Sequence, residues 1–334
     1  MSQNPKWKIL VTDTAWPSVE PEANVLARIN GELTLAKTGA EDELLSLVPT
    51  ADAILTCWKQ VPASVIRAGR KLKVIGRYGI GVDNIAVDEA TQCGILVTNV
   101  PAYCLDEVSD HAMALILACA RKICQYNSGV HAGDWEISSG KPVFRLRGQT
   151  LGIIGFGKIG QALAPKAQAF GMHVLVYDPY IDVEMAEKHL AKKAELDMLL
   201  MEADYVSIHT PLTQTTRGLI DARRLRLMKS TAFIINTARG AIVDQAALVK
   251  SLKERWIAGA ALDVLDPERI PPGHPLLGLP NVIVTPHMAF YSEESVRDLE
   301  IQAAENVGQV LSGRRPAFIV NPEVLKLSRW ANLR

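Results

Sequence analysis

Apolar and polar positions along the first hundred residues alternate between two patterns. Short apolar, β-prone runs predict strands at residues 8–11, 32–36, 53–56, 73–75 and 95–98. Helical spacing of apolar residues between these runs predicts helices at residues 21–29, 41–47, 62–68 and 87–92. Strands and helices that alternate in this way are typical of a parallel α/β sheet.

Asn99-Val100-Pro101 interrupts this alternation, and the chain then changes character. Residues 104–124 are apolar on every side and predict one long helix, buried or at an interface, with Asp106 or Ser109 near its start. Residues 125–148 are polar, with Gly, Trp and Pro among them, and predict a surface arm.

A second alternation of strands and helices begins at Leu151. Its strands are expected at residues 152–154, 174–177, 205–208, 232–236, 259–262 and 282–284. A long helix over 293–312 and a short segment over 317–320 follow, and the tail after Pro322, with Trp330, is either disordered or covers a cleft. We therefore predict an α/β protein in which a domain of residues 102–287 is inserted into a domain of residues 1–101 and 288–334. Two crossings between domains predict a hinged cleft, a common place for a ligand.

Three glycines with the spacing G-x-G-x-x-G directly follow the first strand of the second alternation. The first permits a tight turn, the second lets the backbone approach a pyrophosphate, and the third lets the next helix pack on the sheet. The phosphates would bind the free N–H groups at the N-terminus of that helix. The candidate dinucleotide loop comprises Gly155, Phe156, Gly157, Lys158, Ile159 and Gly160.

Asp178 ends the next strand, about 20 residues after the glycines, as a dinucleotide site requires. A carboxylate there accepts hydrogen bonds from the adenosine ribose and repels a 2′-phosphate, so the expected cofactor is NAD rather than NADP. In the alternative, Asp178 only forms a turn before Pro179.

The composition argues against several other classes of protein. Lys plus Arg equals Asp plus Glu, 36 of each, so the net charge gives no support to nucleic-acid or membrane binding. The five cysteines form no C-x-x-C pair and lack metal-ligand spacing, which predicts no metal site and reduced, buried thiols in a cytoplasmic protein. Residues 1–5 show no signal-peptide pattern, and the longest apolar helical run, residues 112–120, is too short to span a bilayer.

Polar patches follow three strands of the second alternation, at residues 236–240, 263–268 and 285–287. The carboxyl ends of parallel strands share one edge of a sheet, where open α/β folds bind ligands. There Arg239 can bind a carboxylate through two hydrogen bonds, His287 can donate a proton near neutral pH, and Glu268 would hydrogen-bond the imidazole. Considered singly, each is more often a surface or turn residue, but their shared location makes them a candidate acid–base site.

These patches resemble the signature set of the D-isomer-specific 2-hydroxyacid dehydrogenases, and the resemblance extends from about Ile9 to Val320. The matching stretches are residues 77–84, 99–101, 155–160, 237–240, 262–264 and 285–287. Within the family, residues 178–180, 287–293 and 313–316 look most like the branch that contains the C-terminal-binding proteins, and the phosphoglycerate dehydrogenases come next.

The resemblance implies a Rossmann-type NAD domain inserted into a flavodoxin-like substrate domain, and a homodimer formed through residues 104–148. It implies an NAD-dependent D-2-hydroxyacid dehydrogenase, in which Arg239 holds the substrate carboxylate and carbonyl, His287 protonates the carbonyl oxygen and Glu268 pairs with His287. Backbone N–H groups at Gly79, Ile80 and Gly81 would also hold the substrate carboxylate. The implied cofactor contacts beyond the glycine loop are Asp178, Thr210, Pro211, Thr216, Thr237, Ala238, Arg239, Asp263 and His287.

Two positions depart from the family pattern. Arg269, rather than proline, follows Glu268, so Asp266 stays an alternative acid. Phe290 stands where the related branch commonly has tryptophan, which keeps an aromatic wall in the substrate pocket but drops an indole N–H.

Two further cations belong to the first domain. Lys59 follows a strand, and by resemblance Arg77 faces the substrate. With Arg239 they would predict a substrate with a second anionic group, such as a phosphonate, a phosphate or a second carboxylate. In the alternative, Lys59 points to solvent and Arg77 pairs with Asp83 or another acid.

Two other functions are alternatives, because proteins that have them share part of this resemblance. One is an NAD-sensing, protein-binding corepressor with vestigial dehydrogenase activity; the intact Arg239, Glu268 and His287 favour the enzyme, although that branch retains them too. A formate-dehydrogenase-type enzyme is disfavoured because Glu268 is an acid rather than an amide.

Overall fold

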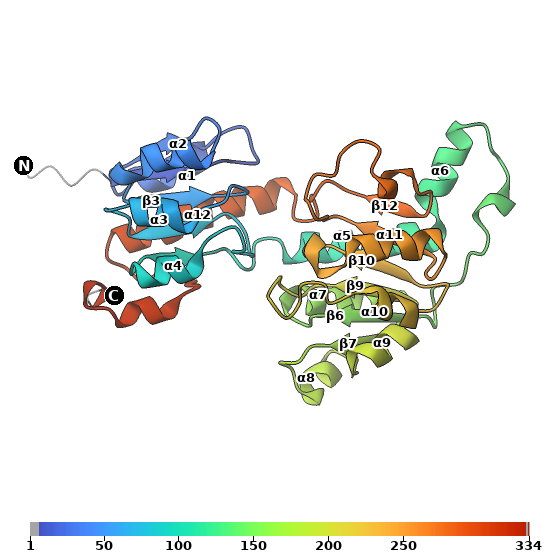
Figure 1. The fold of residues 1–334 in the computed structure, drawn as a ribbon. Helices are drawn as coiled ribbons and strands as arrows, with labels where there is room; N and C mark the ends of the chain where they lie inside the picture. Colours follow the sequence, from blue (N-terminus) through green and yellow to red (C-terminus); the bar gives the residue numbers. More distant parts are fainter. Residues whose placement is uncertain (1–6, 332, 334) are drawn as a thin grey trace, which may run out of the picture. The chain divides into compact units, whose positions relative to one another are not determined.

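The computed structural model describes residues 7–331 and residue 333, and the chain divides into two compact units. Unit 1 comprises the residues up to Tyr103 and from Ser292 onward, and unit 2 comprises Cys104–Tyr291. Each unit is built on a parallel sheet flanked by helices (Figure 1), which confirms the α/β fold with two parallel sheets. Residues 1–5, where we expected no signal peptide, lie outside the described residues.

The sheet of unit 1 has the strand order β2-β1-β3-β4-β5. Its strands are β1 (Trp7–Val11), β2 (Gly31–Leu35), β3 (Ala53–Thr56), β4 (Val74–Arg77) and β5 (Leu96–Thr98). The helices of this unit are α1 (Glu20–Ala27), α2 (Glu41–Leu47), α3 (Ala63–Ala68), α4 (Val87–Gln92) and α12 (Glu293–Leu311). This order is the doubly wound, flavodoxin-like arrangement, with its switch point between β1 and β3.

Alternate residues of the unit 1 strands enter two separate cores, because side chains of a strand point to opposite faces. On β1, Ile9 and Val11 pack with α1 and α12, whereas Leu10 packs with α2 and α3. Helix α12 lies far along the chain from α1 but packs beside it, as Figure 1 shows by its red colour among blue elements. Helix α12 therefore packs against the sheet whose strands all lie within the first hundred residues.

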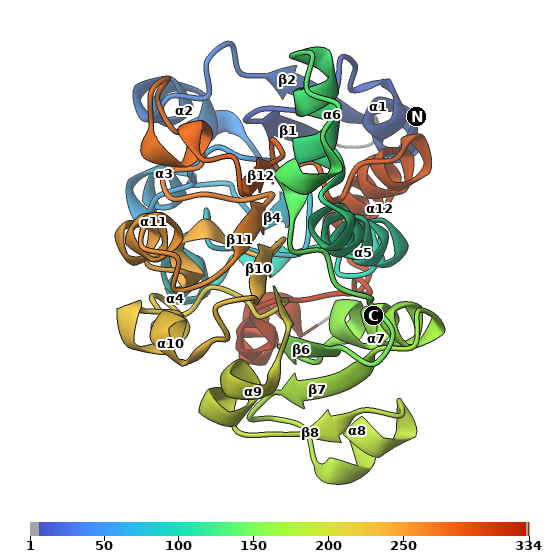
Figure 2. The same ribbon diagram turned by 90° about the vertical axis from the view of Figure 1, so that its right-hand side faces the viewer.

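The sheet of unit 2 has the strand order β12-β11-β10-β9-β6-β7-β8 (Figure 2). Its strands are β6 (Thr150–Ile154), β7 (His173–Tyr177), β8 (Lys192–Lys193), β9 (Tyr205–Ile208), β10 (Phe233–Asn236), β11 (Gly259–Leu262) and β12 (Val282–Val284). The helices are α5 (Leu105–Arg121), α6 (Ile123–His131), α7 (Lys158–Ala169), α8 (Val183–Lys188), α9 (Leu196–Glu202), α10 (Ala222–Leu227) and α11 (Gln245–Lys253). The order extends that of Rossmann folds, and its switch point lies between β6 and β9.

The predicted helix over residues 104–124 is wrong in its length. Lys122 adopts a left-handed conformation with φ 53°, which ends α5 at Arg121 and starts α6 at Ile123. Non-glycine residues rarely adopt this conformation, so the sequence gives no warning of the break. The predicted surface arm is exposed, but it begins with α6 rather than with irregular chain.

The C-terminal tail packs on unit 1, so the expectation of a disordered tail is wrong for its described residues. Asn321 accepts the N–H of Val97 on β5 at 2.8 Å, and the indole of Trp330, 8% exposed, donates to the carbonyl of Gly94 at 2.9 Å. The short segment over 317–320 forms no strand in this structure, although the N–H of Val320 donates to Val97.

The cysteines follow the prediction only in part. Each of the five is a free thiol, and Cys57, Cys104 and Cys119 are buried as expected. Cys93 is half-buried at the end of α4. Cys124 is exposed on α6, which has no buried residues and which begins after the turn at Lys122.

Two buried acids on α1 and α12 make the stability of unit 1 depend on pH. Burial, and then the charge of Glu22, raise the pKa of Glu300 to about 7. Burial likewise raises the pKa of Glu22, against hydrogen bonds that include those from Tyr78 and Trp16. The folded chain therefore binds a proton at Glu300 more tightly than the unfolded chain does.

Protonation of Glu300 contributes fully to the free energy of unfolding below about pH 4.5. This contribution, up to about 3 kcal/mol, is lost as the pH rises through about 7. Glu300→Gln should therefore flatten the fall in unfolding free energy between pH 5 and pH 8. Urea unfolding of both proteins, followed by tryptophan fluorescence, measures this difference. Equal slopes in the two proteins would contradict the assignment to Glu300.

Candidate active site

Three neighbouring strands of unit 2 bring their carboxyl ends together. β10, β11 and β12 are parallel neighbours, so the residues that follow them meet at one edge of the sheet. Arg239 follows β10, Glu268 lies in the connection after β11, and His287 follows β12. The fold thus places the three candidate catalytic side chains on a common edge.

His287 and Glu268 form a close pair at this edge. His287 Nδ1 lies 2.6 Å from Glu268 Oε1, and the two side chains are 17% and 45% exposed. A carboxylate oxygen can only accept, so Nδ1 carries the hydrogen and Nε2 is the ring nitrogen left for proton exchange with a ligand. The alternative acid, Asp266, lies instead 3.8 Å from Arg217.

Asp263 holds the loop that carries His287. Its buried carboxylate accepts the N–H groups of Met288 and Ala289, each at 2.9 Å, and its carbonyl accepts the N–H of His287 at 2.8 Å. These bonds wrap the loop around one side chain and maintain the left-handed backbone of His287, whose φ is 54°. The unusual conformation is thus determined by the surroundings of His287 rather than by the residue itself.

The loop that carries Arg239 is tied to β10 and to the chain after β11. Asn236 donates to the carbonyl of Arg239 at 2.9 Å and accepts the N–H of Ala238 at 3.0 Å. At Gly240 a Cβ atom would lie 2.0 Å from the carbonyl carbon of Leu265. Only glycine allows this approach, which joins the arginine loop to the segment that leads to Glu268.

The glycine loop has the geometry expected of a phosphate site. Gly155 has φ 89°, and a Cβ there would lie 2.7 Å from the backbone of His209 and Thr210 at the end of β9. Gly157 precedes α7 without a side-chain cap, and a Cβ added to it would meet nothing within 4 Å. Open space beside uncapped N–H groups is what a pyrophosphate requires.

Asp178 lies at the end of β7 against this loop. Its carboxylate accepts the N–H of Phe156 at 2.8 Å and the N–H of Tyr180 at 2.9 Å. The bond from Tyr180 forms the turn that the alternative role of Asp178 predicts. Asp178 therefore forms this turn and also holds the glycine loop through the N–H of Phe156. Unused lone pairs of the two oxygens remain suited to a ribose diol.

The remaining cofactor candidates lie at the ends of β9 and β10. Thr216 donates to the carbonyl of Pro211 at 2.6 Å and accepts the N–H of Thr213, which folds the chain after Thr210 into a compact turn. Thr237 Oγ1 is buried and has no hydrogen-bond partner among the described residues. An unpaired buried hydroxyl at the strand-end edge is consistent with a bound ligand.

Sequence reasoning missed His209, which directly follows β9 and lies against Gly155 of the glycine loop. Its Nε2 is 2.8 Å from Ser207 Oγ, and burial lowers its pKa to about 4. His209 is therefore neutral near pH 7, and its own backbone is among the atoms closest to Gly155. The pattern gave no signal, because one histidine at a strand end does not reveal its burial.

Unit 1 carries the candidate substrate residues Arg77, Gly79, Ile80 and Gly81. Arg77 is buried, donates through Nε to Asn84 Oδ1 at 3.1 Å and lies near the Trp58 ring, 5.8 Å from its centroid. Its Nη1 lies so close to Gly79 that a Cβ there would be 2.7 Å away. The guanidinium and the start of the 79–81 loop therefore lie together.

Lys59 is exposed on a turn whose backbone is held firmly. Asp13 accepts the N–H groups of Cys57, Trp58 and Lys59 at 2.7–3.2 Å. Asn84 donates to the carbonyl of Lys59 at 2.8 Å and so links this turn to Arg77. No sequence pattern points to Asp13, which lies 44 residues before the first of its partners.

The aromatic ring of Phe290 lies against the imidazole of His287. The ring centroids of His287 and Phe290 lie 6.4 Å apart at 76°, an edge-on arrangement, and the Tyr291 ring lies 6.3 Å from that of Phe290. An aromatic ring thus stands next to the candidate acid.

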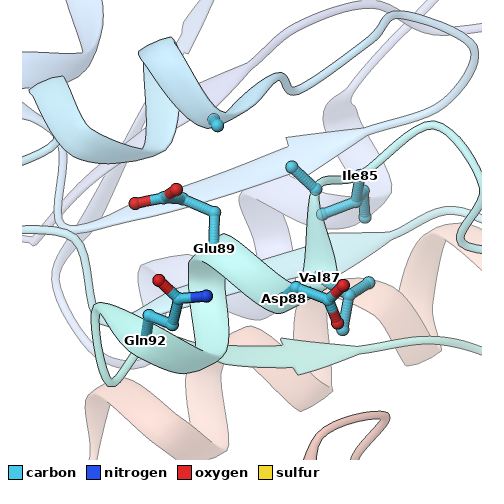
Figure 3. Close-up of a pocket in the computed structure, with 7 residues that line it drawn as sticks. Ile85, Val87, Asp88, Glu89 and Gln92 are labelled. Carbon is cyan, nitrogen blue, oxygen red and sulfur yellow. The ribbon is translucent and has the colours of Figure 1, made fainter.

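Two hollows lie apart from these residues. One, of about 440 Å³, belongs to unit 1 and is lined by Ala63, Ile85, Ala86, Val87, Asp88, Glu89 and Gln92 (Figure 3). Its Glu89 is already paired with Arg67 at 2.8 Å. The other, of about 30 Å³, lies beside Lys122 and Phe233 of unit 2. Neither contains a residue that we predicted for the site.

The described residues contain no group of three or more His, Cys, Asp or Glu side chains arranged to hold a metal ion. Within the same part of the chain, none of the helices has both the length and the apolar character that crossing a membrane requires.

Comparisons with known proteins agree with this geometry. Residues 113–289 match the family described as "D-isomer specific 2-hydroxyacid dehydrogenase, NAD binding domain". A protein of Korarchaeum cryptofilum named glyoxylate reductase is 42% identical over 85% of this chain and 87% of its own length. The D-3-phosphoglycerate dehydrogenase of Methanocaldococcus jannaschii is 41% identical over 94% of this chain, which spans 59% of that longer protein.

A solved structure extends the likeness to the whole fold. The D-lactate dehydrogenase of Aquifex aeolicus, crystallised with NAD and lactic acid, superposes with a TM-score of 0.84 at 27% identity. The superposition covers 96% of this chain and 97% of that one.

Proposed function

Since the chain belongs to the D-isomer-specific 2-hydroxyacid dehydrogenases, we propose that Arg239, Glu268 and His287 assist the reduction of a small 2-keto acid by NADH to the D-2-hydroxy acid. The protein is an NAD-dependent oxidoreductase of this family. The observation that carries the proposed roles is the 2.6 Å contact of His287 with Glu268, on the sheet edge that also receives Arg239. The relatives found are named as enzymes, so the corepressor-like alternative is wrong.

The chemistry follows from the charges that these side chains hold. The loop of residues 155–160 and Asp178 would hold NADH, which would supply the hydride for the carbonyl carbon. Negative charge then develops on the carbonyl oxygen, and the guanidinium of Arg239 stabilises it there while holding the substrate carboxylate. His287 Nε2 gives its proton to that oxygen, and Glu268 on Nδ1 stabilises the imidazolium before transfer.

A panel of 2-keto acids tests this function directly. The purified protein should oxidise NADH, followed by absorbance, with glyoxylate, pyruvate or a larger 2-keto acid. Failure with every member of the panel would contradict the proposed substrate class.

We assign the cofactor to unit 2 and the substrate-specific contacts of Arg77 and residues 79–81 to unit 1, as the two domains of the sequence prediction require. The placement near the C-terminal-binding-protein branch is also a proposal, because the relatives found are named glyoxylate reductase and D-3-phosphoglycerate dehydrogenase. The cytoplasmic location expected from the cysteines likewise stays a prediction.

Asp178 provides the sharpest test of cofactor choice. Asp178→Asn keeps the size and one acceptor oxygen but removes the charge that repels a 2′-phosphate. The ratio of kcat/KM for NADH to that for NADPH should fall by about 10- to 100-fold, since a charge-assisted hydrogen bond contributes about 1.5–3 kcal/mol. Steady-state kinetics with both cofactors measures the ratio. An unchanged ratio in a variant with the wild-type Tm would rule out this role for Asp178.

The second anionic group of the substrate is a separate proposal. It is supported by the firm turn that presents Lys59 and by the Asn84 link from that turn to Arg77. Lys59→Met should lower kcat/KM for oxaloacetate by about 10-fold while changing that for pyruvate little, because only the dianion would contact the ammonium group. Lys71→Met, an exposed lysine of the same unit, is the matched control. Equal effects on both substrates would end this proposal.

A homodimer through the arm is supported by apolar exposure. Along α6 and the arm, Ile123, Val130, Trp135, Ile137 and Phe144 are 42–81% exposed. Such a stretch of exposed apolar side chains favours an interface. Sedimentation of the wild type and of Trp135→Asp with Ile137→Asp should show a dimer and a monomer, respectively.

A further inference from the structure

His111 joins the candidate site from a helix that we did not associate with it. It lies on α5, and its Nε2 is 3.1 Å from Thr285 Oγ1. Thr285 Oγ1 in turn donates to Asp263 Oδ1 at 2.5 Å. A continuous chain of side chains therefore runs from α5 to the buried acid that holds the His287 loop.

The chemistry of these groups fixes the direction of each hydrogen bond. Asp263 already accepts two backbone N–H groups, and a carboxylate has no hydrogen to give. The single hydroxyl hydrogen of Thr285 must then point to Asp263, so its oxygen can only accept from His111. His111 therefore carries a hydrogen on Nε2.

The acid at the centre of this network has little freedom. Asp263 is 1% exposed, and Nε2 of His111 lies 3.7 Å from its Oδ1. A buried carboxylate needs several donors to remain in place. Thr285, Met288 and Ala289 supply them, and the position of the threonine hydroxyl depends on His111.

We propose that His111 is a positioning residue for proton transfer: through Thr285 and Asp263 it fixes the loop on which His287 stands. This inference rests on the proposed role of His287. Removal of the Nε2–H donor frees the threonine hydroxyl to rotate, and the loop around Asp263 loses its fixed arrangement. The cofactor loop at Gly155–Gly160 lies on other strands and stays intact.

The first test observes the hydrogen bond itself. Long-range ¹H–¹⁵N spectra of the histidine-labelled protein, assigned with His111→Gln, report which ring nitrogen carries the hydrogen. His111 should show a protonated Nε2. A neutral ring with its hydrogen on Nδ1 would overturn the proposal, whether or not the protein reduces a 2-keto acid.

The second test separates positioning from folding. His111→Leu removes the donor at similar volume, whereas His111→Gln places an amide N–H near the same point. The leucine variant should lower kcat by about 10-fold, with the dissociation constant of NADH within about 2-fold of wild type, and the glutamine variant should recover most of kcat. His131→Leu, an exposed histidine on α6, is the control.

A double-mutant cycle then tests the route. Thr285→Val should lower kcat like His111→Leu, and the double variant should lose no more than the larger single effect. Additive losses, or a glutamine variant as slow as the leucine variant, would contradict action through Thr285. If the wild type has no reductase activity, only the proposed function is refuted. The spectra would still show whether His111 donates its Nε2 hydrogen to Thr285.

Discussion

Replacing His287 by asparagine is expected to lower kcat/KM for 2-keto acid reduction by about 10²- to 10⁴-fold, the usual contribution of a general acid. Asparagine is the suitable replacement because it tolerates the left-handed backbone that His287 adopts at φ 54°. The loop held by Asp263 should therefore keep its place, and the loss should come from proton donation. Steady-state kinetics with NADH and the best 2-keto acid measures it.

Two companion measurements make this result specific. Glu268→Gln should cost less than His287→Asn, since it weakens only the partner of Nδ1 and leaves Nε2 in place. His173→Asn, at an exposed position on β7, should leave the rate unchanged. A variant at His287 that stays within about 10-fold of wild type would show that another group donates the proton.

Gly240→Ala is expected to destabilise unit 2 by about 3 kcal/mol or more and to abolish most activity. The added Cβ would lie 2.0 Å from the carbonyl carbon and 2.2 Å from the carbonyl oxygen of Leu265. Both are backbone atoms, so no side chain can rotate away, and the Arg239 loop must separate from the segment that leads to Glu268. Thermal unfolding should show a lower Tm.

The matched control is Gly278→Ala, where a Cβ would meet nothing within 4 Å. Its Tm should lie near that of wild type. If Gly240→Ala keeps both the wild-type Tm and the wild-type kcat/KM, the close approach of the two loops is not required, and the connection that we draw between Arg239 and Glu268 is wrong.

Much of the fold could be predicted because its signals are local. The strands before Arg239 and His287 are short apolar runs, and the residue after each run falls at the sheet edge wherever strands are parallel. The glycine spacing and Asp178 act within one β-α-β unit. The break at Lys122 could not be predicted, because a left-handed lysine leaves no mark in the pattern of apolar positions.

The supporting contacts of the site could not be predicted for a different reason. His111 and Thr285 are 174 residues apart, and Asp13 and Trp58 are 45 apart. Such pairs are brought together by strand order and by the packing of α5 on the sheet, and neither the partner nor the distance can be read from the sequence. The choice between Glu268 and Asp266 also needed the folded loop, which turns one acid to His287 and leaves the other beside Arg217.

The hold of Asp263 on the His287 loop has a consequence for how this protein could change its specificity in evolution. The carboxylate of Asp263 accepts hydrogen bonds from the main-chain N–H groups of Met288 and Ala289. The position of the loop therefore does not depend on the side chains of these two residues. Phe290 is next along the loop, and we expect a larger or more polar residue there to leave the backbone of His287 in place. If Phe290 and His287 have the roles proposed above, a change of substrate preference at position 290 would leave the backbone that presents His287 in place.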